Sequence, residues 1–510
     1  MLARVRSLSV LGVDAFEVQV EVDLAPGLPV FNTVGLPNGA VRESKERVRS
    51  ALVNSGFDMP LGRITVNLAP ADIRKEGAGF DLPMALGILA ASGAFPAEAL
   101  RGLAVVGELA LDGAIRPVKG VLPMAVAATA LERVTALVVP GDNGPEAAVV
   151  QGVPVLAAGR LDQVVSHLRG VEPLATVKSD ADWLADGDDR DQADMREVRG
   201  QEHVKRALTI AAAGGHNVLM VGPPGSGKTM LARRLATILP PLSFGEAVEV
   251  TQVASVAGTL AAGQALVNRR PFRAPHHTVS DAGLIGGGSV PRPGEVSLAH
   301  HGVLFLDELP EFKKSVLEVM RQPLEDGWVT ITRASATVDY PARFMLVAAM
   351  NPCPCGYHGD PRRQCTCSPR QVRQYLGRVS GPLMDRIDIQ IEVPAVPFKD
   401  LSDETAGPPS AEYRELVLAS RQRQAQRFSH NGIYCNAQMN TKQTQRYCRL
   451  GHDCLGLLER AMDRFKLSAR AYNRIRKIAR TIADLDGADE IGLAHISEAI
   501  GYRSLDRGAP

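Results

Sequence analysis

Hydrophobic positions in the first third of the chain mostly alternate with polar ones. Runs such as FEVQVEVDL, RITVNLAP, LAVVGELAL and ALVVP are typical of strands, while residues 41–56 and 81–92 have the apolar spacing of helices. We therefore predict an α+β domain over residues 1–171. Residues 172–195 have neither period and contain SDADWLADGDDRDQAD, which is typical of a solvated acidic linker between two domains.

The pattern changes at residue 196 to strands that are apolar throughout, separated by helical segments. NVLMVG, GVLFLDE and ARFMLVAAMNP are typical of strands buried on both faces, which predicts a parallel α/β sheet over residues 196–397. WVTITRASATVDY predicts a β-hairpin within this domain. Strand patterns end after residue 397, and helical periodicity over residues 412–427, 454–467 and 469–485 predicts a helical domain over residues 398–510.

Composition places the chain among soluble globular proteins. Of its 510 residues, 45% are hydrophobic and 22% are charged, which excludes global disorder, and the length is too great for a single core. The net charge of +1 indicates no polyanion partner by itself, although residues 412–510 have a basic excess. The longest apolar runs are too short or interrupted, so we predict no membrane span; four of the seven cysteines crowd into residues 353–367, which favours a reducing, cytoplasmic location.

One motif follows the strand NVLMV and opens a helix, with the spacing of a phosphate-binding loop. Its glycines let backbone N–H groups face phosphate oxygens, its lysine adds a charge at the β and γ phosphates, and its hydroxyl can bind Mg²⁺. The sequence therefore predicts an ATP and Mg²⁺ site. The motif consists of Gly222, Pro223, Pro224, Gly225, Ser226, Gly227, Lys228 and Thr229.

A second motif places two carboxylates after the apolar strand GVLFL. Carboxylates are costly inside a core strand, so Asp307 and Glu308 are expected to emerge at the carboxyl edge of the sheet. There Asp307 would help to hold Mg²⁺, and Glu308 would orient or deprotonate the attacking water.

These motifs, together with Asn351 after FMLVAAM and the sequence LMDRID, resemble the AAA+ ATPases. Within them the chain is most similar to the ComM/YifB family of magnesium-chelatase-like proteins, through segments such as KEGAGFDLPMALGILAASG, FRAPHHTVSDAGLIGGG and NPCPCGYHGD. The resemblance implies a hexameric ring with a helical lid. It also implies that Asn351 positions the lytic water, that Arg386 is an arginine finger for the neighbouring subunit, and that Arg470 is the sensor-2 arginine, acting in cis or in trans.

The resemblance also implies two inserted elements. Residues 272–295 occupy the place of a helix-2 insert, and residues 329–338 that of a hairpin whose basic residue, here Arg333, faces a ring pore and contacts DNA phosphates. The alternative is an arginine on a solvated hairpin. A further basic cluster suits single-stranded DNA, although its histidines could equally hold the insert together; it comprises Arg269, Arg270, Phe272, Arg273, His276 and His277.

The N-terminal domain resembles the ribosomal-S5-like fold of the Lon protease domain. The positions of the Lon serine and lysine fall on Gly79 and Leu122, so acyl transfer by that dyad is excluded. A shifted pair of Ser92 with Lys119 lacks any nucleophile-turn pattern. We predict that this domain serves as a cap or assembly platform.

Four cysteines have the spacing CxC-x9-CxC directly after Asn351: Cys353, Cys355, Cys365 and Cys367. Four thiolates could close a tetrahedral zinc site, in which His358 could replace one ligand. A redox pair and simple reduced thiols are the alternatives.

The resemblance implies two candidate functions. The first is a hexameric ATP-dependent DNA motor, a helicase or branch-migration enzyme in natural transformation or homologous recombination, with recombination proteins as possible partners. The second is an AAA+ remodelling ATPase that acts on a protein, as the magnesium-chelatase motor subunit does. Both use the same phosphate site, so this motif does not distinguish them.

Overall fold

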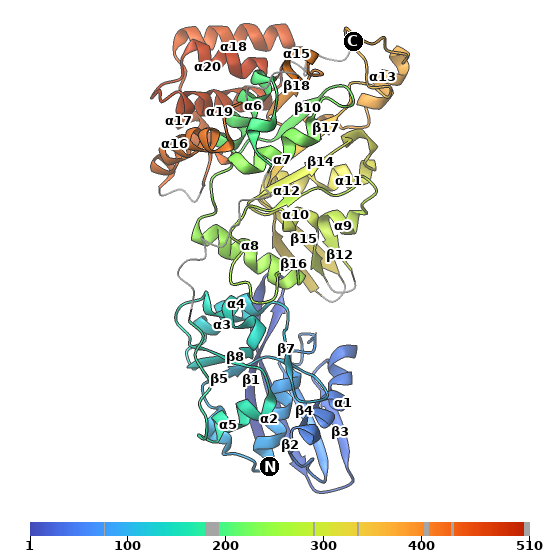
Figure 1. The fold of residues 1–510 in the computed structure, drawn as a ribbon, viewed down its shortest axis with the longest axis vertical. Helices are drawn as coiled ribbons and strands as arrows, with labels where there is room; N and C mark the ends of the chain where they lie inside the picture. The colour runs from blue at the N-terminus through green and yellow to red at the C-terminus, as the bar shows by residue number, and fades with distance from the viewer. Residues whose placement is uncertain are drawn as a thin grey trace.

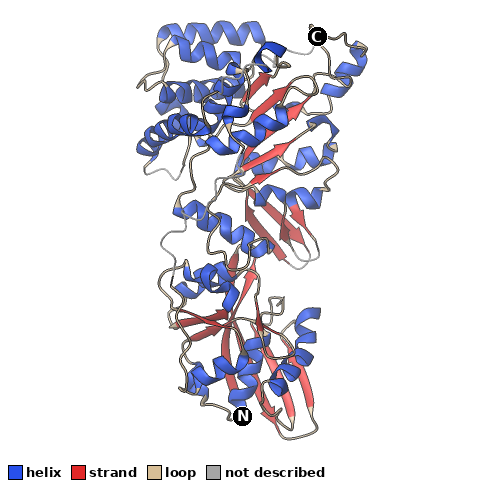
Figure 2. Ribbon diagram, in the orientation of Figure 1, coloured by secondary structure: helices blue, strands red, loops and turns tan. Residues whose placement is uncertain are grey.

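The computed structural model describes residues 1–75, 77–178, 193–288, 291–333, 336–401, 407–429 and 433–503. The molecule is elongated, with the N-terminal sheet at one end, a second sheet in the middle and a group of helices at the other end (Figures 1 and 2). Most of the predicted acidic linker, residues 179–192, lies outside the described residues.

The N-terminal part is built on a seven-stranded mixed sheet with the strand order β3-β4-β2-β1-β5-β8-β9. In strand β2, Val18, Val20 and Val22 alternate with polar residues, and all three are buried against helix α2, whose residues after Asp81 are all apolar. The bounds are β1 Leu2–Leu11, β2 Asp14–Ala25, β3 Val30–Val34, α1 Gly39–Asn54, β4 Arg63–Ala69, α2 Asp81–Ala91, β5 Leu103–Val105, β6 Glu108–Leu109, β7 Ile115–Arg116, α3 Val121–Ala130, β8 Ala136–Pro140, α4 Gly144–Ala148, β9 Val155–Ala158 and α5 Leu161–Leu168.

The middle sheet has five strands in the order β11-β14-β17-β10-β18, and every pairing is parallel, which confirms the predicted parallel sheet. Alternate residues of each strand enter different cores: Val218 and Met220 face one, Leu219 and Val221 the other. The bounds are α6 Glu202–Gly214, β10 Val218–Val221, α7 Lys228–Ile238, α8 Phe244–Ala257, β11 Phe272–Arg273, α10 Glu295–Leu298, β14 Val303–Leu306, α11 Lys314–Val319, α12 Arg321–Asp326, β17 Met345–Met350, α13 Pro369–Leu376, α14 Gly381–Met384, β18 Ile389–Glu392 and α15 Phe398–Leu401.

The C-terminal helices share a hydrophobic core with one face of the middle sheet. Side chains of α16 and α19 pack on α6 and α7, in the same buried cluster as Val218 and Val303. The helical segment is therefore joined to the middle domain by a continuous core. The helices are α16 Ser410–Phe428, α17 Thr441–Tyr447, α18 His452–Phe465, α19 Ala469–Leu485 and α20 Leu493–Gly501.

Helices α3 and α4 join the N-terminal part to helix α8 of the middle domain. Leu122 packs with Val149 and Leu266 across this junction. The Glu146 carboxylate accepts a hydrogen bond from the backbone N–H of Leu122 at 2.9 Å and another from the Ser255 hydroxyl on α8. Burial raises the pKa of Glu146, despite these hydrogen bonds, so the junction holds a desolvated polar group inside an apolar contact.

The inserted elements lie together at the end of the middle domain that faces the N-terminal sheet (Figure 1). They comprise α9 Asp281–Ile285, β12 Gly286–Gly287, β13 Arg292–Pro293 and the hairpin of β15 Trp328–Arg333 with β16 Ala336–Pro341. The turn between β1 and β2 touches this hairpin: Val13 packs on its core, and a Cβ atom on Gly12 would lie 2.4 Å from Val338. The predicted hairpin is thus confirmed, and it is braced by the N-terminal sheet. The insert itself begins after residue 273, because Phe272 and Arg273 form the edge strand β11.

A buried histidine pair supports the start of strand β14. His300 and His301 each bond one oxygen of Glu249, at 2.9 and 2.8 Å, and His300 Nδ1 accepts from the backbone N–H of Arg343 at 3.0 Å. Burial lowers the pKa of His300 to about 4, well below its ordinary value of 6.5. In the native state this imidazole is therefore neutral through most of the acidic range.

We expect acid to destabilise the protein through His300. Below pH 6.5 the unfolded state binds a proton that the native state takes up only near pH 4, so stability present at neutral pH is lost as the pH falls across this window, by up to about 3 kcal/mol. His300→Gln should flatten the pH dependence of the unfolding temperature between pH 4 and 7. His452→Gln is the control, because His452 on α18 is fully exposed. Equal pH profiles for His300→Gln and the wild type would contradict this assignment.

Candidate functional site

The phosphate-binding loop lies between strand β10 and helix α7, as predicted. Gly225 and Gly227 have φ values of +76° and +89°, a backbone conformation that favours glycine. A Cβ atom on Gly222 would lie 2.1 Å from the carbonyl oxygen of Val393. These positions therefore require glycine, and the loop leads directly into the N-terminus of α7, where unpaired backbone N–H groups favour anions.

Lys228 is buried at the start of α7 and points back over the loop. Its ammonium donates to the carbonyl oxygens of Gly222 and Pro223, at 2.7 and 2.9 Å, and to Oδ1 of Asn351 at 3.2 Å. Burial lowers the pKa of Lys228 while Asp307 raises it. The structure thus brings together three residues that lie far apart in the sequence, in the positions that a phosphate site requires.

Thr229 and Asp307 form a set of oxygen donors suited to Mg²⁺. The hydroxyl of Thr229 donates to Oδ2 of Asp307 at 2.6 Å, so both oxygens can turn toward one small cation. Asp307 directly follows β14, whose parallel neighbour β17 ends just before Asn351, and the carboxyl ends of both strands meet at the same edge. Ser226 adds a buried hydroxyl without a partner among the described residues, which fits a loop that folds around a ligand.

Glu308 contacts a residue of the inserted segment. Its Oε2 lies 3.3 Å from Nδ1 of His277, and its own backbone N–H donates to Asp307 at 2.9 Å. His277 also stacks on His276, with ring centroids 4.1 Å apart. The sequence indicated His277 only as a member of a basic cluster. The contact with Glu308 could have been suggested only by the place of the insert, which directly follows β11, the edge strand beside β14.

The two arginines that the sequence singled out as finger and sensor lie near the same carboxylate, that of Glu325. Arg386 is buried, pairs with Glu325 and donates to the carbonyl oxygen of Pro382 at 2.6 Å, while Arg470 lies 3.7 Å from Asp385. Arg386 first, and Arg470 more weakly, lower the pKa of Glu325.

Both arginines line a cavity of about 730 Å³, and the described residues that line it include none of residues 222–229. Within one chain, Arg386 and Arg470 are therefore grouped with each other and apart from the phosphate loop.

Arg333 lies at the tip of the β15–β16 hairpin and contacts the neighbouring insert. Its Nε donates to the carbonyl oxygen of Gly288 at 3.3 Å, and a Cβ atom on Gly287 would lie 3.0 Å from its guanidinium. Gly287 is paired in register with the exposed Arg292. The two tips therefore present Arg333 and Arg292 close together. Sequence reasoning missed Arg292, because nothing local shows that β13 lies beside the hairpin.

The predicted basic cluster at residues 269–277 does not form one groove. Arg270 points inward, where it bonds the carbonyl oxygens of Pro240 and His301 and both oxygens of Glu246, an arrangement that favours an internal structural role. Arg273 makes a bidentate pair with Glu295 at 2.6 and 2.7 Å. The ring centroids of Phe272 and Phe305 lie 6.1 Å apart within the sheet. Arg269 is exposed, and it too interacts with another group of the protein.

The positions that match the Lon dyad are occupied by residues with packing roles. Leu122 lies in the junction with α8, and the backbone of Gly79 accepts from Gly107 at 2.9 Å. Ser92 caps α2 by donating to Leu89, whereas Lys119 reaches the carbonyl oxygen of Ala257, so the two serve separate contacts.

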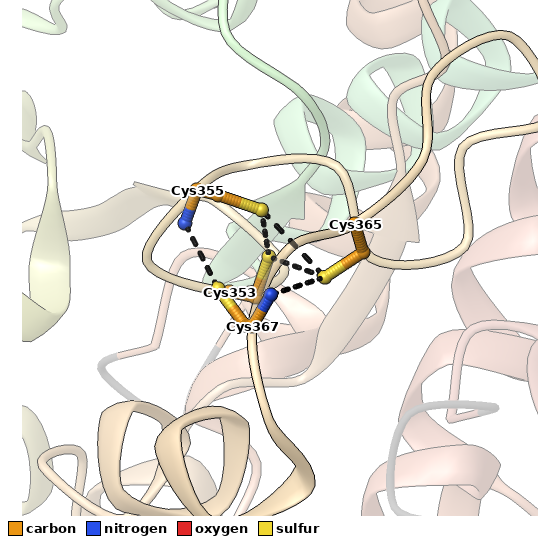
Figure 3. Close-up of side chains that lie close together, drawn as sticks. All are labelled: Cys353, Cys355, Cys365 and Cys367. Carbon is orange, nitrogen blue, oxygen red and sulfur yellow. Dashed lines mark hydrogen bonds between the residues drawn. The ribbon is translucent and has the colours of Figure 1, made fainter.

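The four cysteines predicted as ligands gather in one cluster (Figure 3). His358, the substitute ligand considered from sequence, lines the neighbouring cavity instead. In the part of the chain that the structure describes, we find no helix with the length and apolarity to cross a membrane.

Comparison with known proteins gives full-length similarity. The chain is 47% identical to the competence protein ComM of Haemophilus influenzae over 99% of this chain and 98% of that protein. It is 44% identical to YifB of Salmonella typhimurium over the same shares, and 25% identical to the magnesium-chelatase 38 kDa subunit of Rhodobacter capsulatus over 59% of this chain and 83% of that one.

Three family models match successive parts of the chain: subunit ChlI of magnesium chelatase over residues 20–143, magnesium chelatase subunit ChlI over residues 194–401, and the ChlI C-terminal model over residues 407–503. Membership of this AAA+ group implies ATPase activity. The full-length matches and the geometry of the phosphate loop agree, and the chain belongs to the ComM/YifB family of magnesium-chelatase-like AAA+ ATPases.

Proposed function

We propose that the chain forms a hexameric ring that uses ATP hydrolysis to move DNA strands, as a helicase or branch-migration motor in natural transformation or homologous recombination. The observation that carries the proposal is the separation of two half-sites within one chain. Lys228, Thr229 and Asp307 lie at the phosphate loop, while Arg386 and Arg470 line a different cavity. A complete catalytic site then needs two copies, as in a head-to-tail ring.

The residues divide the work of hydrolysis. The phosphate loop and Lys228 hold the β and γ phosphates. Thr229 and Asp307 would hold Mg²⁺, which would offset the charge that develops on the γ-phosphate during its transfer to water. Asn351 and Glu308 position the attacking water, and Glu308 accepts its proton. The neighbour's Arg386 stabilises the γ-phosphate in the transition state, with Arg470 beside it.

DNA is the proposed substrate because two arginines lie on adjoining hairpin tips that belong to neither half-site. These are Arg333 and Arg292, and guanidinium groups suit phosphate oxygens. The name of the relative from Haemophilus influenzae, a competence protein, fits a role in the uptake or integration of DNA. Arg270 and Arg273 carry little of this proposal, because both are held in internal pairs.

A strand-displacement and branch-migration assay tests this function. The purified full-length protein should hydrolyse ATP faster with DNA and should displace strands from forked and three-way substrates. DNA binding should weaken steeply with salt. Intact ATPase without binding or displacement, at concentrations at which rings form, would instead favour the second candidate, a motor that remodels a protein partner.

Removing His277 should raise ATP hydrolysis in the absence of DNA. The contact of Glu308 with His277 occupies the carboxylate that accepts the water's proton, so His277→Ala frees that carboxylate to contact the water. Because a partly exposed pair contributes up to about 1 kcal/mol, we expect an increase of up to about fivefold, with less stimulation by DNA. The measurement is a steady-state ATPase assay with and without DNA.

His276→Ala is the matched control for this prediction. His276 stacks on His277, but its own hydrogen bond goes to Thr278. An increase shared by both variants would assign the effect to the insert as a whole, and a decrease in His277→Ala would show that the pair positions Glu308 for catalysis.

A further inference from the structure

The four cysteines of the CxC-x9-CxC segment converge on one point. Cys353 and Cys355 have their sulfur atoms 3.3 Å apart, and that of Cys365 lies 3.7 and 3.6 Å from them. All four sulfur atoms lie within 4.8 Å of one another. Figure 3 shows the four side chains pointing toward one another from two segments of one loop.

These distances match a four-sulfur metal site. With a Zn–S bond of about 2.3 Å, the sulfur atoms at the corners of a tetrahedron lie about 3.8 Å apart. A disulfide needs about 2.05 Å, and all four cysteines are free thiols in the structure. Thiol groups this close repel one another when ionised, and a divalent cation removes that repulsion.

Backbone N–H groups already point at the sulfur atoms. Those of Cys355 and Cys367 donate to the sulfur atoms of Cys367 and Cys365, each at 3.4 Å. Such hydrogen bonds orient metal ligands and stabilise the thiolate form. Cys353 is buried, the other three are partly exposed, and the site therefore has the shielding and the access that a structural ion requires.

The loop that carries these thiols lies against the nucleotide site. It starts two residues after Asn351, which accepts from Lys228, and it ends at Ser368, the N-cap of α13. A Cβ atom on Gly356 would lie 2.4 Å from Cδ of Pro224 in the phosphate loop. The same loop and the start of the phosphate loop line a cavity of about 790 Å³. Helix α13 returns to this point, since the Tyr375 hydroxyl bonds the backbone of Asn351.

We propose that Cys353, Cys355, Cys365 and Cys367 bind one structural zinc ion, which fixes this loop as a wall of the nucleotide site. Zinc joins the two ends of the loop. It thereby keeps Asn351 next to Lys228 and Gly356 next to Pro224. The metal site stands on its own geometry, while its effect on nucleotide binding rests on the proposed function.

Metal analysis of the purified full-length protein tests the site without any activity assay. We expect about one zinc per chain, and X-ray absorption should show sulfur ligands at about 2.3 Å. Cys353→Ser and Cys367→Ser should lower zinc affinity by at least tenfold. Cys454→Ser is the matched control, because Cys454 lies on α18, where its thiol donates to the carbonyl oxygen of Ile491.

Two results would overturn the site. One is a reduced protein whose four thiols all react with a thiol reagent and which takes up no zinc when it is added. The other is a native protein whose mass shows a disulfide among these cysteines. If the serine variants fail to fold, substitution of the wild-type metal by Co²⁺ answers the question, because tetrahedral thiolate ligation gives a distinct visible spectrum.

A pair of glycine variants tests the link to the nucleotide. Gly356→Ala and Gly359→Ala both place alanine in a left-handed backbone conformation, with φ near +87° and +81°, but only the first meets a neighbour, Pro224. Both variants should retain zinc, and only Gly356→Ala should bind a fluorescent ATP analogue about tenfold more weakly. Equal affinities in the two variants would overturn the coupling and leave the metal site to be judged by its zinc content.

Discussion

A mixture of Lys228→Ala and Arg386→Ala subunits is expected to hydrolyse ATP although neither variant does so alone. Lys228→Ala removes the cation that holds the β and γ phosphates, and Arg386→Ala removes the proposed finger, whose loss costs at least about 10³-fold in turnover. In a head-to-tail ring, an interface is complete when the first variant supplies Arg386 and the second supplies Lys228. Random mixing makes about a quarter of the interfaces complete.

The expectation depends on where Arg386 lies. In one chain it is buried beside Glu325, in a cavity whose described lining includes none of the phosphate loop, so we expect it to act on the γ-phosphate of the next subunit. The measurement is steady-state ATPase activity across mixing ratios, with ring formation followed by sizing. Arg460→Ala, which removes an exposed arginine from α18, controls for the removal of a charge.

A mixture that stays inactive while mixed rings form would show that Arg386 acts within its own chain or only supports the fold. Substitution of Arg470 is a second test of the shared interface. Arg470 is largely exposed and forms an ion pair with Asp385 at 3.7 Å, so Arg470→Ala should fold normally and should also be rescued by Lys228→Ala subunits.

The phosphate site could be predicted from sequence because its determinants are local. The spacing of the loop fixes its glycines and places Lys228 and Thr229 at the first turn of α7. The place of Asp307 at the carboxyl edge of the sheet was also predicted, and there it accepts a hydrogen bond from Thr229.

Contacts between distant elements could not be predicted in this way. The sequence groups Arg270 with its basic neighbours, but its partners Glu246, Pro240 and His301 come from three other segments. The sequence presents Leu122 only as the position of a missing lysine, and the structure shows it packed against the middle domain. Charge and spacing along the chain contain no information about such neighbours.

The hairpin variants Arg333→Ala and Arg333→Lys should separate hydrolysis from strand movement. Arg333 lies at the tip formed with Arg292, and its side chain bonds only backbone oxygens among the described residues: those of Gly288 and Thr332. Its removal should therefore leave the phosphate site intact. We expect Arg333→Ala to keep its DNA-independent ATPase rate and to show strand displacement no higher than background.

Arg333→Lys keeps the charge but not the fork of donors, so it should displace strands at a reduced rate. In DNA-binding measurements across salt concentrations, the alanine variant should show a slope smaller by roughly 0.7–0.9 for each phosphate that it no longer neutralises, whereas the lysine variant should keep the wild-type slope. Arg460→Ala again controls for net charge. Normal strand displacement by Arg333→Ala would show that the hairpin does not contact the DNA. A fall in the basal ATPase rate of this variant would mean instead that the contact of Arg333 with Gly288 affects Glu308, through the insert that carries His277.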